Sequence, residues 1–481
     1  MDASSVIADR LDDYRESLFD LLGHRTISTT GEGMAAGAEA VTEFLSHSGF
    51  DTRRIETSRY PLVYGEWTPD DATEPDRPTV VFYGHYDVQP ADDPAAWDSP
   101  PFEPTVRDGA IYARGAGDNK GQFVAHAFAL DALVRAGEAP DVTVKLLLEG
   151  GEESGSLGLK QYLGVTADDR VGGEAAHSDA ATHSETATDS DAVPDEIAPE
   201  IADADLVYVA DGPQHRSGRP TIIYGNRGIL TFELRHETAA EPLHSGNFGG
   251  PVPNAATELV ETLASMVDGD RVTVEGFHDG ISVSDRDREL IDRLPDDENA
   301  IREELGIDRL ATERDYYERL FTRPTLTING IEGGYTGEGH KTVLPNEARA
   351  TCDCRLVPGQ DPDRVFETIR AHVNRVRPEI TVERGTAFPP MKTPADTPVA
   401  EPVRAALREV WDDDPVELPV LGGSLPAAFF RSVPSLSDVP VLVVPYANPD
   451  QGNHSPNEHL DVRCFENGIR TSAAVLRRLG E

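Results

Sequence analysis

The feature that most constrains this chain is an alternation of short apolar strands and a helix near its N-terminus. Residues 78–83 form a β-branched and aromatic run that Gly84 ends. Residues 121–136 then have helical periodicity, and a second apolar run follows at Val142–Leu148. Two strands that are joined through a helix pair in parallel, and helices then cover the faces of the sheet. The pattern therefore predicts an α/β domain with a mostly parallel sheet flanked by helices.

The chain beyond residue 225 has a different pattern, in which strands and helices follow in the order typical of a two-layer α+β domain. Six runs carry it, with strands at 229–234, 325–331, 347–356 and 380–384 and helices at 254–267 and 363–376. After a proline-rich join, a helix at 403–411 and a strand at 439–444 have the character of the first domain again. We expect this last part to return to the first sheet.

These patterns predict a discontinuous α/β domain that is interrupted by an inserted α+β domain. The first domain takes residues 1–225 and 391–481, and the inserted domain takes residues 226–390. Residues 165–205 are rich in Ala, Asp, Glu, Ser and Thr and contain almost no large apolar side chains. Such a segment cannot bury enough surface to offset its ordering entropy, so we expect an acidic surface insertion there.

The charge balance excludes two classes of partner. The chain has 43 basic and 86 acidic residues and a formal net charge of −43. Nucleic acids and anionic membranes require a basic surface, so we expect neither as a partner. Only five of the basic residues are lysines. We interpret an acidic, lysine-poor surface as halophilic, because molar salt screens charges over about 3 Å. An acidic mesophilic protein is the alternative.

The sequence contains no targeting or membrane signal that we recognise, and we therefore expect a cytoplasmic protein. Residues 1–5 lack the basic and apolar regions of a signal peptide. The longest apolar runs have about seven residues, whereas a helix that spans a bilayer needs about 18. Three cysteines cannot form a disulfide framework. Cys352 and Cys354 lie two apart in a strand-like run, so we expect both in the core.

Polar motifs follow the two predicted strands of the first domain. The sequence G-H-Y-D places His85 and Asp87 two apart, so an extended backbone points both side chains the same way. The second strand leads into E-G-G-E-E-S-G, which contains Glu152 and Glu153. Binding sites of open α/β sheets lie at the carboxyl ends of the strands. One glutamate can then bind a metal while its neighbour handles protons.

Three further motifs supply Asp118 in R-G-A-G-D-N-K-G, Asp211 in V-A-D-G and His454 in N-H-S-P-N-E. A glycine-rich turn before a helix can hold phosphate, but this one matches neither G-x-G-x-x-G nor the P-loop. Asp118 also occupies a position where an anion would need amides, so a bridging carboxylate is the better interpretation. Oxygen and imidazole ligands without thiolate are typical of Zn²⁺ and also admit Mn²⁺ or Co²⁺.

The ordered motifs resemble a known family. They are G-H-Y-D-V-Q-P, R-G-A-x-D-x-K-G, E-G-x-E-E-S-G-S, L-H-S-G-x-x-G-G, H-K-T-V-L-P, R-L-V-P, G-G-S-L-P and H-S-x-N-E. This set is similar to the co-catalytic metallopeptidases that include carnosinase, acetylornithine deacetylase and succinyl-diaminopimelate desuccinylase, and most similar to the cytosolic nonspecific dipeptidase and carnosinase branch. The resemblance covers residues 80–460. It departs at 165–205 and at Leu421, where that branch usually has a charged residue.

The resemblance implies two divalent metal ions, most simply zinc. His85, Asp118 and Asp211 would hold one ion. Asp118, Glu153 and His454 would hold the other, so that Asp118 bridges the pair.

The resemblance also implies the catalytic roles. Glu152 would be the general base for a hydroxide that bridges the metals, and Asp87 would orient His85. His244 would stabilise the oxyanion from the inserted domain of a partner subunit, which implies a homodimer and a lid or dimerisation role for residues 226–390.

Arg355 and the loop of Gly422, Gly423 and Ser424 would bind the substrate's free carboxylate, with the guanidinium acting as a bidentate fork. We therefore predict an enzyme that hydrolyses the peptide bond of dipeptides or short peptides with a free C-terminal carboxylate. An N-acyl amino acid deacylase on the same fold is the alternative. A metal-binding protein without catalysis is a third possibility, which Glu152 and Asp87 argue against, because metal storage needs no base.

Overall fold

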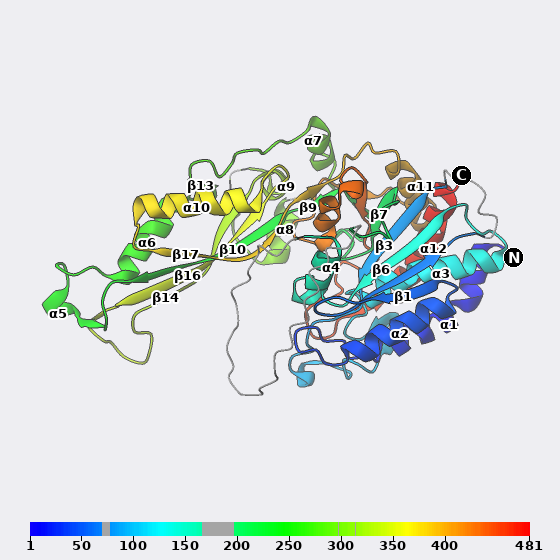
Figure 1. The fold of residues 1–481 in the computed structure, drawn as a ribbon, viewed down its shortest axis with the longest axis horizontal. Coiled ribbons are helices and arrows are strands. Elements are labelled where there is room, and N and C mark those ends of the chain that lie inside the picture. The colour runs from blue at the N-terminus through cyan, green and yellow to red at the C-terminus, as the bar shows by residue number, and fades with distance from the viewer. Residues whose placement is uncertain (70–76, 166–196, 297, 313) are drawn as a thin grey trace.

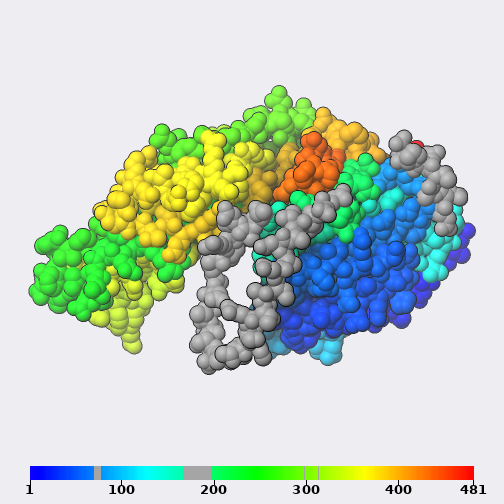
Figure 2. Space-filling view, in the orientation of Figure 1, coloured from blue at the N-terminus to red at the C-terminus, as the bar shows by residue number. Residues whose placement is uncertain are grey.

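A computed structural model describes residues 1–69, 77–165, 197–296, 298–312 and 314–481 (Figure 1). Two sheets organise these residues. A sheet of eight strands and its helices form one part, and a sheet of four strands extends from it as a second lobe (Figure 2). Among the described helices, none combines the length and apolar composition that crossing a membrane requires.

The larger sheet has the strand order β1-β2-β6-β3-β7-β20-β8-β19. Its strands are β1 (Asp51–Ile55), β2 (Leu62–Trp67), β3 (Thr79–His85), β6 (Thr143–Glu149), β7 (Leu206–Val209), β8 (Thr221–Ile223), β19 (Val416–Leu418) and β20 (Val441–Val443). In the middle of the sheet β3 pairs in parallel with β6 and β7, and β7 pairs in parallel with β20. The pairs β1–β2, β2–β6 and β8–β20 are antiparallel, so the sheet is mixed. The parallel pairing that the sequence predicts is found in the centre of the sheet.

Helices and loops cover both faces of this sheet. Along β3, Val80 and Phe82 point into one apolar cluster, whereas Val81 and Tyr83 point into another. A strand buried on both faces is typical of the centre of an α/β sheet. The first cluster packs beneath five helices, which are α1 (Ala3–Leu22), α2 (Met34–His47), α3 (Lys120–Ala136), α11 (Ala400–Trp411) and α12 (Val462–Leu479). The second includes residues of α4 (Leu157–Tyr162) and of the 3₁₀ helices Pro426–Ser432 and Pro434–Leu436.

The smaller sheet is antiparallel and has the order β14-β16-β10-β17. Its strands are β10 (Gly228–Glu237), β14 (Thr325–Gly333), β16 (Glu347–Leu356) and β17 (Thr381–Phe388), and its helices are α6 (Ala255–Met266) and α10 (Pro362–Val376). Both helices contribute to a third apolar cluster with alternate residues of β16. Cys352 and Cys354 are buried in that cluster, as predicted. The prediction of a two-layer α+β arrangement agrees with this sheet.

The remaining elements are short. They are β4 (Thr105–Arg107), β5 (Ala110–Tyr112), β9 (Gly225–Asn226), β11 (Leu243–His244), β12 (Val267–Asp268), β13 (Arg271–Val272), β15 (Val343–Leu344), β18 (Met391–Lys392), β21 (His459–Asp461), α5 (Ser245–Phe248), α7 (Asp285–Ile291), α8 (Glu298–Leu305), α9 (Tyr316–Thr322) and the 3₁₀ helices Pro94–Ala96 and Glu152–Ser154.

The strands β9 and β18 pair where the chain passes between the two sheets. The division at residues 226 and 390 remains a proposal. Ile291 of α7 and Phe321 of α9, which fall between those boundaries, pack in the second cluster of the larger part. Of the predicted insertion at 165–205, residues 166–196 lie outside the described residues. Near its end, Ala198 and Ile201 are buried in the same cluster.

Candidate metal centre

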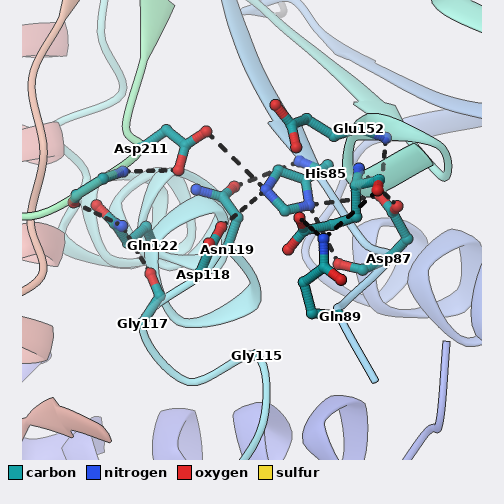
Figure 3. A network of polar contacts seen from close by, with 12 residues as sticks. His85, Asp87, Gln89, Gly115, Gly117, Asp118, Asn119, Gln122, Glu152 and Asp211 are labelled. Carbon is teal, nitrogen blue, oxygen red and sulfur yellow. Dashed lines mark hydrogen bonds and ion pairs between the residues drawn. The ribbon is translucent and has the colours of Figure 1, made fainter. Parts of the chain in front are cut away.

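The candidate site lies where three neighbouring parallel strands end. His85 is the last residue of β3 and is paired with Glu149, the last residue of β6. Asp211 follows β7, the other neighbour of β3, and Glu152 follows β6. Because the strands are parallel, their carboxyl ends share one edge of the sheet. The polar side chains that follow them therefore converge there (Figure 3).

The first group of possible ligands is His85, Asp118 and Asp211. The His85 Nε2 atom lies 3.1 Å from Asp118 Oδ1 and 3.9 Å from Asp211 Oδ2. One ligand atom from each residue lies within 4.8 Å of the others, so the three can hold one ion. All three residues are buried.

The second group is Asp118, Glu153 and His454. The His454 Nε2 atom lies 3.1 Å from Asp118 Oδ2 and 3.2 Å from Glu153 Oε2. Asp118 therefore presents one oxygen to each group, which is the geometry of a bridging carboxylate. Unlike His85, the His454 side chain is 53 % exposed. The structure brings together both ligand sets that the sequence analysis named.

Asp87 contacts residues of both ligand groups. The His85 Nδ1 atom is 3.1 Å from the main-chain oxygen of Asp87 and 3.4 Å from its Oδ1. The Asp87 carboxylate also accepts hydrogen bonds from the main-chain amides of Glu152 at 3.2 Å and Glu153 at 3.1 Å. It can therefore orient the His85 ring, as expected, and it also holds the turn that carries both glutamates.

Burial and hydrogen bonding shift the pKa values of several of these residues. Burial opposes ionisation of Asp118, but hydrogen bonds with His454 and His85 lower its pKa. Hydrogen bonds with Asp118 and Glu153 raise the pKa of His454 to about 10. Burial, together with the charge of Asp118, raises the pKa of Asp211 to about 7. A divalent cation neutralises such a cluster in place of the protons, because metal ligands bind in their deprotonated forms.

The donor set fits a dinuclear metal centre. It contains carboxylate oxygens and imidazole nitrogens, and the three cysteines are all buried elsewhere. Zn²⁺ accepts these ligands readily, and Mn²⁺ and Co²⁺ are compatible with them. The residues would thus hold two ions, one in each group, without fixing which metal is used.

Glu152 stands beside the ligands in the 3₁₀ turn Glu152–Ser154 (Figure 3). Its carboxylate has no hydrogen-bond partner among the described residues, whereas Glu153 accepts a bond of 2.8 Å from Gln89 Nε2. Burial, partly opposed by the charge of His85, raises the pKa of Glu152 well above its ordinary value. A glutamate of raised pKa and free oxygens is suited to accept a proton.

One buried residue that the sequence analysis left without a role supports the metal centre. Glu458 accepts hydrogen bonds from the main-chain amides of Gly115 at 3.1 Å, Gly117 at 2.9 Å and Asp118 at 3.0 Å. It also accepts one of 2.6 Å from Arg114 Nη1. Its carboxylate therefore holds the loop that presents the bridging aspartate. In the sequence, Glu458 is marked only as the last residue of the H-S-x-N-E motif.

The side-chain amides of Gln89 and Asn119 also support the site, and the sequence motifs did not indicate this role. Gln89, which binds Glu153, lies in the G-H-Y-D-V-Q-P motif. Asn119 donates to the main-chain oxygen of Ala210 at 2.7 Å and accepts from the main-chain amide of His85 at 3.3 Å. It thus ties the start of α3 to the ends of β3 and β7.

The residues predicted to bind the substrate carboxylate also lie together. Arg355, near the end of β16, donates from Nη1 to Ser424 Oγ at 3.1 Å. The main-chain oxygen of Gly423 accepts a bond of 3.1 Å from the Arg227 amide, which holds the loop of Gly422, Gly423 and Ser424 beside the start of β10.

His244 lies apart from this assembly. It is exposed in β11, and its Nδ1 accepts a hydrogen bond of 3.0 Å from the Gly246 amide. Figure 1 shows α5, which follows it directly, at the far end of the smaller sheet from β3 and β6. Within one chain, therefore, the structure does not bring His244 to the metal ligands.

Several known proteins are similar to this chain over most of its length. Residues 81–478 match the model of a family described as peptidase family M20/M25/M40. The chain is 26 % identical to the β-Ala-His dipeptidase of Rattus norvegicus, with 88 % of this chain and 80 % of the relative covered. It is 28 % identical to the Cys-Gly metallodipeptidase of Schizosaccharomyces pombe, with 87 % and 83 % covered. Among solved structures, an M20 family metallo-carboxypeptidase from Sulfolobus solfataricus is similar, with a TM-score of 0.82, 29 % identity, and 97 % and 99 % of the two chains covered.

Proposed function

The chain belongs to peptidase family M20/M25/M40, and we propose that this metallopeptidase hydrolyses dipeptides with two divalent ions bound between His85, Asp118, Glu153, Asp211 and His454. The observation that carries the proposal is the pair of ligand groups that share Asp118 at the carboxyl edge of the larger sheet. The similar dipeptidases support the choice of substrate class.

The two ions would supply Lewis acidity, which lowers the pKa of water and polarises a carbonyl group. Glu152 would take the proton from the attacking water, because its carboxylate has a raised pKa and no competing partner among the described residues. The same residue would then give that proton to the leaving amine. Asp87 would keep the His85 ring and the Glu152 turn in register through its four close contacts.

Arg355 and the loop of Gly422, Gly423 and Ser424 would bind the free C-terminal carboxylate of the substrate. The contact between Arg355 and Ser424 supports this role, since it places a guanidinium and a hydroxyl side by side. A guanidinium binds a carboxylate through two parallel hydrogen bonds. This contact would select peptides with a free C-terminus.

His244 would complete the site from a second subunit of a homodimer. It is exposed directly before α5, which lies at the far end of the smaller sheet (Figure 1), so it could reach the metal centre of a partner chain although it does not reach that of its own chain. An imidazole there could donate to the oxyanion that forms during attack.

We further propose that the enzyme works in a cytoplasm of high salt concentration. The net charge of −43 and the small number of lysines support this setting. The large negative potential would be screened there and self-repulsion would fall.

The test combines metal analysis with a substrate screen. Purified protein should contain two divalent ions per chain, and it should hydrolyse unblocked dipeptides faster than N-acetyl or N-succinyl amino acids. A preference for the N-acyl compounds would make it a deacylase of the same fold. Full metal content without hydrolysis of either class would contradict the proposal.

A further inference from the structure

A cavity of about 310 Å³ lies beside the proposed carboxylate-binding residues. The hairpin of β12 and β13, the helix α9 and the first residues of β14 surround it. Its lining includes Arg227, Val272, Leu320, Thr325, Leu326 and Thr327. None of these residues has a role in the metal centre.

Arg227 is the unusual member of this lining. Its residue surface is only 3 % exposed. Its Nη2 makes long hydrogen bonds to Arg355 O at 3.3 Å, Thr325 Oγ1 at 3.4 Å and Arg323 O at 3.5 Å. Its Nε is buried and has no hydrogen-bond partner among the described residues. In a chain with 86 acidic and 43 basic residues, no carboxylate of the described part forms an ion pair with it.

A buried guanidinium without an anion is costly, because it loses its hydration without gaining a counter-charge. Burial, with the positive charges of Arg355 and Arg319 nearby, lowers the pKa of Arg227 to about 10. Arg319 itself is compensated, since it binds the carboxylate and main-chain oxygen of Asp270. Arg355 lies near the carboxylate of Asp353, at 3.7 Å. Of these three arginines, Arg227 is therefore the one that forms no ion pair with a carboxylate of the described residues.

The cavity adjoins the place proposed for the substrate's C-terminus. The Arg227 amide donates to the main-chain oxygens of Leu421 and Gly423, both at 3.1 Å, and its guanidinium binds the oxygen of Arg355. Leu320, which lines the cavity, lies 3.6 Å from where a Cβ on Gly422 would be. A C-terminal residue bound through its α-carboxylate at Arg355 would have this cavity within reach of its side chain.

We propose that this cavity binds a carboxylate at Arg227, namely the side chain of an Asp or Glu at the C-terminal position of the peptide. The inference rests on the proposed function, whose substrate it makes more specific. A free carboxylate such as acetate has the same chemistry, and the experiment must separate these two sources.

The first arm compares dipeptides with the metal-loaded enzyme. Ala-Glu and Ala-Gln have side chains of equal size and differ in charge. A hydrogen bond to a charged group changes an equilibrium by about 10- to 100-fold, so kcat/KM for Ala-Glu should exceed that for Ala-Gln by about tenfold or more. Ala-Gly supplies the reference rate for each enzyme variant.

The second arm supplies a carboxylate from the protein. Thr327 is exposed, lines the cavity and lies two residues from Thr325 on the same face of β14. Thr327→Glu should place an anion near Arg227 and reduce the ratio of Ala-Glu to Ala-Gln to about 1. Thr327→Gln, of the same size but neutral, should keep the wild-type ratio. If both variants keep it, the ratio does not depend on Arg227 and the proposal is wrong.

The third arm adds acetate at constant ionic strength and follows Tm. Equal rates for Ala-Glu and Ala-Gln, with acetate raising the Tm of wild type but not of Thr327→Glu, would assign the cavity to a free carboxylate and overturn the substrate assignment. Equal rates without an acetate effect would refute the anion site altogether. If no dipeptide is hydrolysed at all, the proposed function fails, and the acetate arm still decides whether the cavity binds a carboxylate.

Discussion

Glu152 and Glu153 are adjacent in sequence but have different surroundings. Glu153 contacts His454 and Gln89, whereas the Glu152 carboxylate has no partner among the described residues. We expect Glu152→Gln to keep both metal ions while kcat falls by about 10²- to 10⁴-fold, because only the proton transfer is lost. Metal content and single-turnover rates measure the two effects separately.

Glu153→Gln is the matched control for that change. It should weaken binding of the ion that His454 shares, because one ligand loses its charge. If Glu152→Gln loses metal and Glu153→Gln does not, the two roles are reversed.

Glu458 allows the support of the bridging aspartate to be tested at a residue that belongs to neither ligand group. In Glu458→Gln the amide cannot accept from all of the main-chain amides of Gly115, Gly117 and Asp118. We expect metal affinity to fall by about 10- to 100-fold, which is typical of substitutions at residues that orient metal ligands through hydrogen bonds. Titration of the metal-free protein with Zn²⁺ or Mn²⁺ measures it. Glu466→Gln, on the helix α12, is the control, and equal affinity in both variants would remove this role from Glu458.

The contrast between these residues shows how far the sequence alone could lead. His85, Asp118, Glu153 and His454 stand in distinctive motifs, so their residue types and order indicated a metal site. The role of Glu458 depends on main-chain amides in a distant loop, and no residue type marks a main-chain donor.

At the scale of elements, the start of α3 decides whether Asp118 is presented correctly. A Cβ on Gly121 would lie 2.0 Å from the main-chain oxygen of Ala116 and 2.6 Å from Leu460 Cδ2. Alanine favours helices by about 1 kcal/mol over glycine, but a clash with main chain costs about 1–3 kcal/mol. Gly121→Ala should therefore lower the Tm, and more so with metal bound, because the Asp118 loop must shift. Differential scanning calorimetry with and without metal measures both values.

Gly23→Ala is the control for that experiment. Gly23 caps α1 with a φ of −66°, and a Cβ there would come no closer than 3.4 Å to any atom. It should leave the Tm close to that of wild type. A higher Tm for Gly121→Ala would show that helix propensity outweighs the contact with Ala116.

Strands and helices with strong periodicity were predicted correctly, among them β3, α3, β6 and the four strands of the smaller sheet. The edge strand β1 of the larger sheet and its neighbour β2 were missed. In β1 the residues Asp51–Ile55 include two arginines and are largely exposed, so no apolar pattern marks them. The strand β2 contains a glycine and a glutamate. Both depend on pairing within the sheet, β2 with β6 and β1 with β2, which is a tertiary effect.

For the whole molecule, the position of His244 makes a test of subunit exchange possible. We expect a homodimer in which His244→Ala is folded and metal-loaded but has a kcat about 10²- to 10³-fold lower. Mixed with Glu152→Gln under conditions of exchange, it should regain activity, since a hybrid dimer then has one site with both residues intact. An active monomer, or a mixture that stays inactive although mass spectrometry shows hybrids, would exclude action across subunits.

The surface charge leads to a second prediction for the whole molecule. With 86 acidic and 43 basic residues, the folded chain repels itself at low ionic strength. Stability and activity should rise between about 50 mM and about 2 M KCl, as the Debye length shortens. Thermal unfolding across that range measures it, with glycerol as a control for general stabilisation by cosolvents. A flat profile would contradict the halophilic interpretation and leave the metallopeptidase assignment unaffected.

The strand β20 lies inside the larger sheet, between β7 and β8, although it comes from the last part of the chain. During synthesis the ribosome must pass Val443 before that gap can close, and α12 follows later still. All four strands and both covering helices of the smaller sheet lie within residues 228–388, so they leave the ribosome before β20 does. Because domains fold as units, the smaller sheet and its helices can finish folding while the larger sheet still lacks β20.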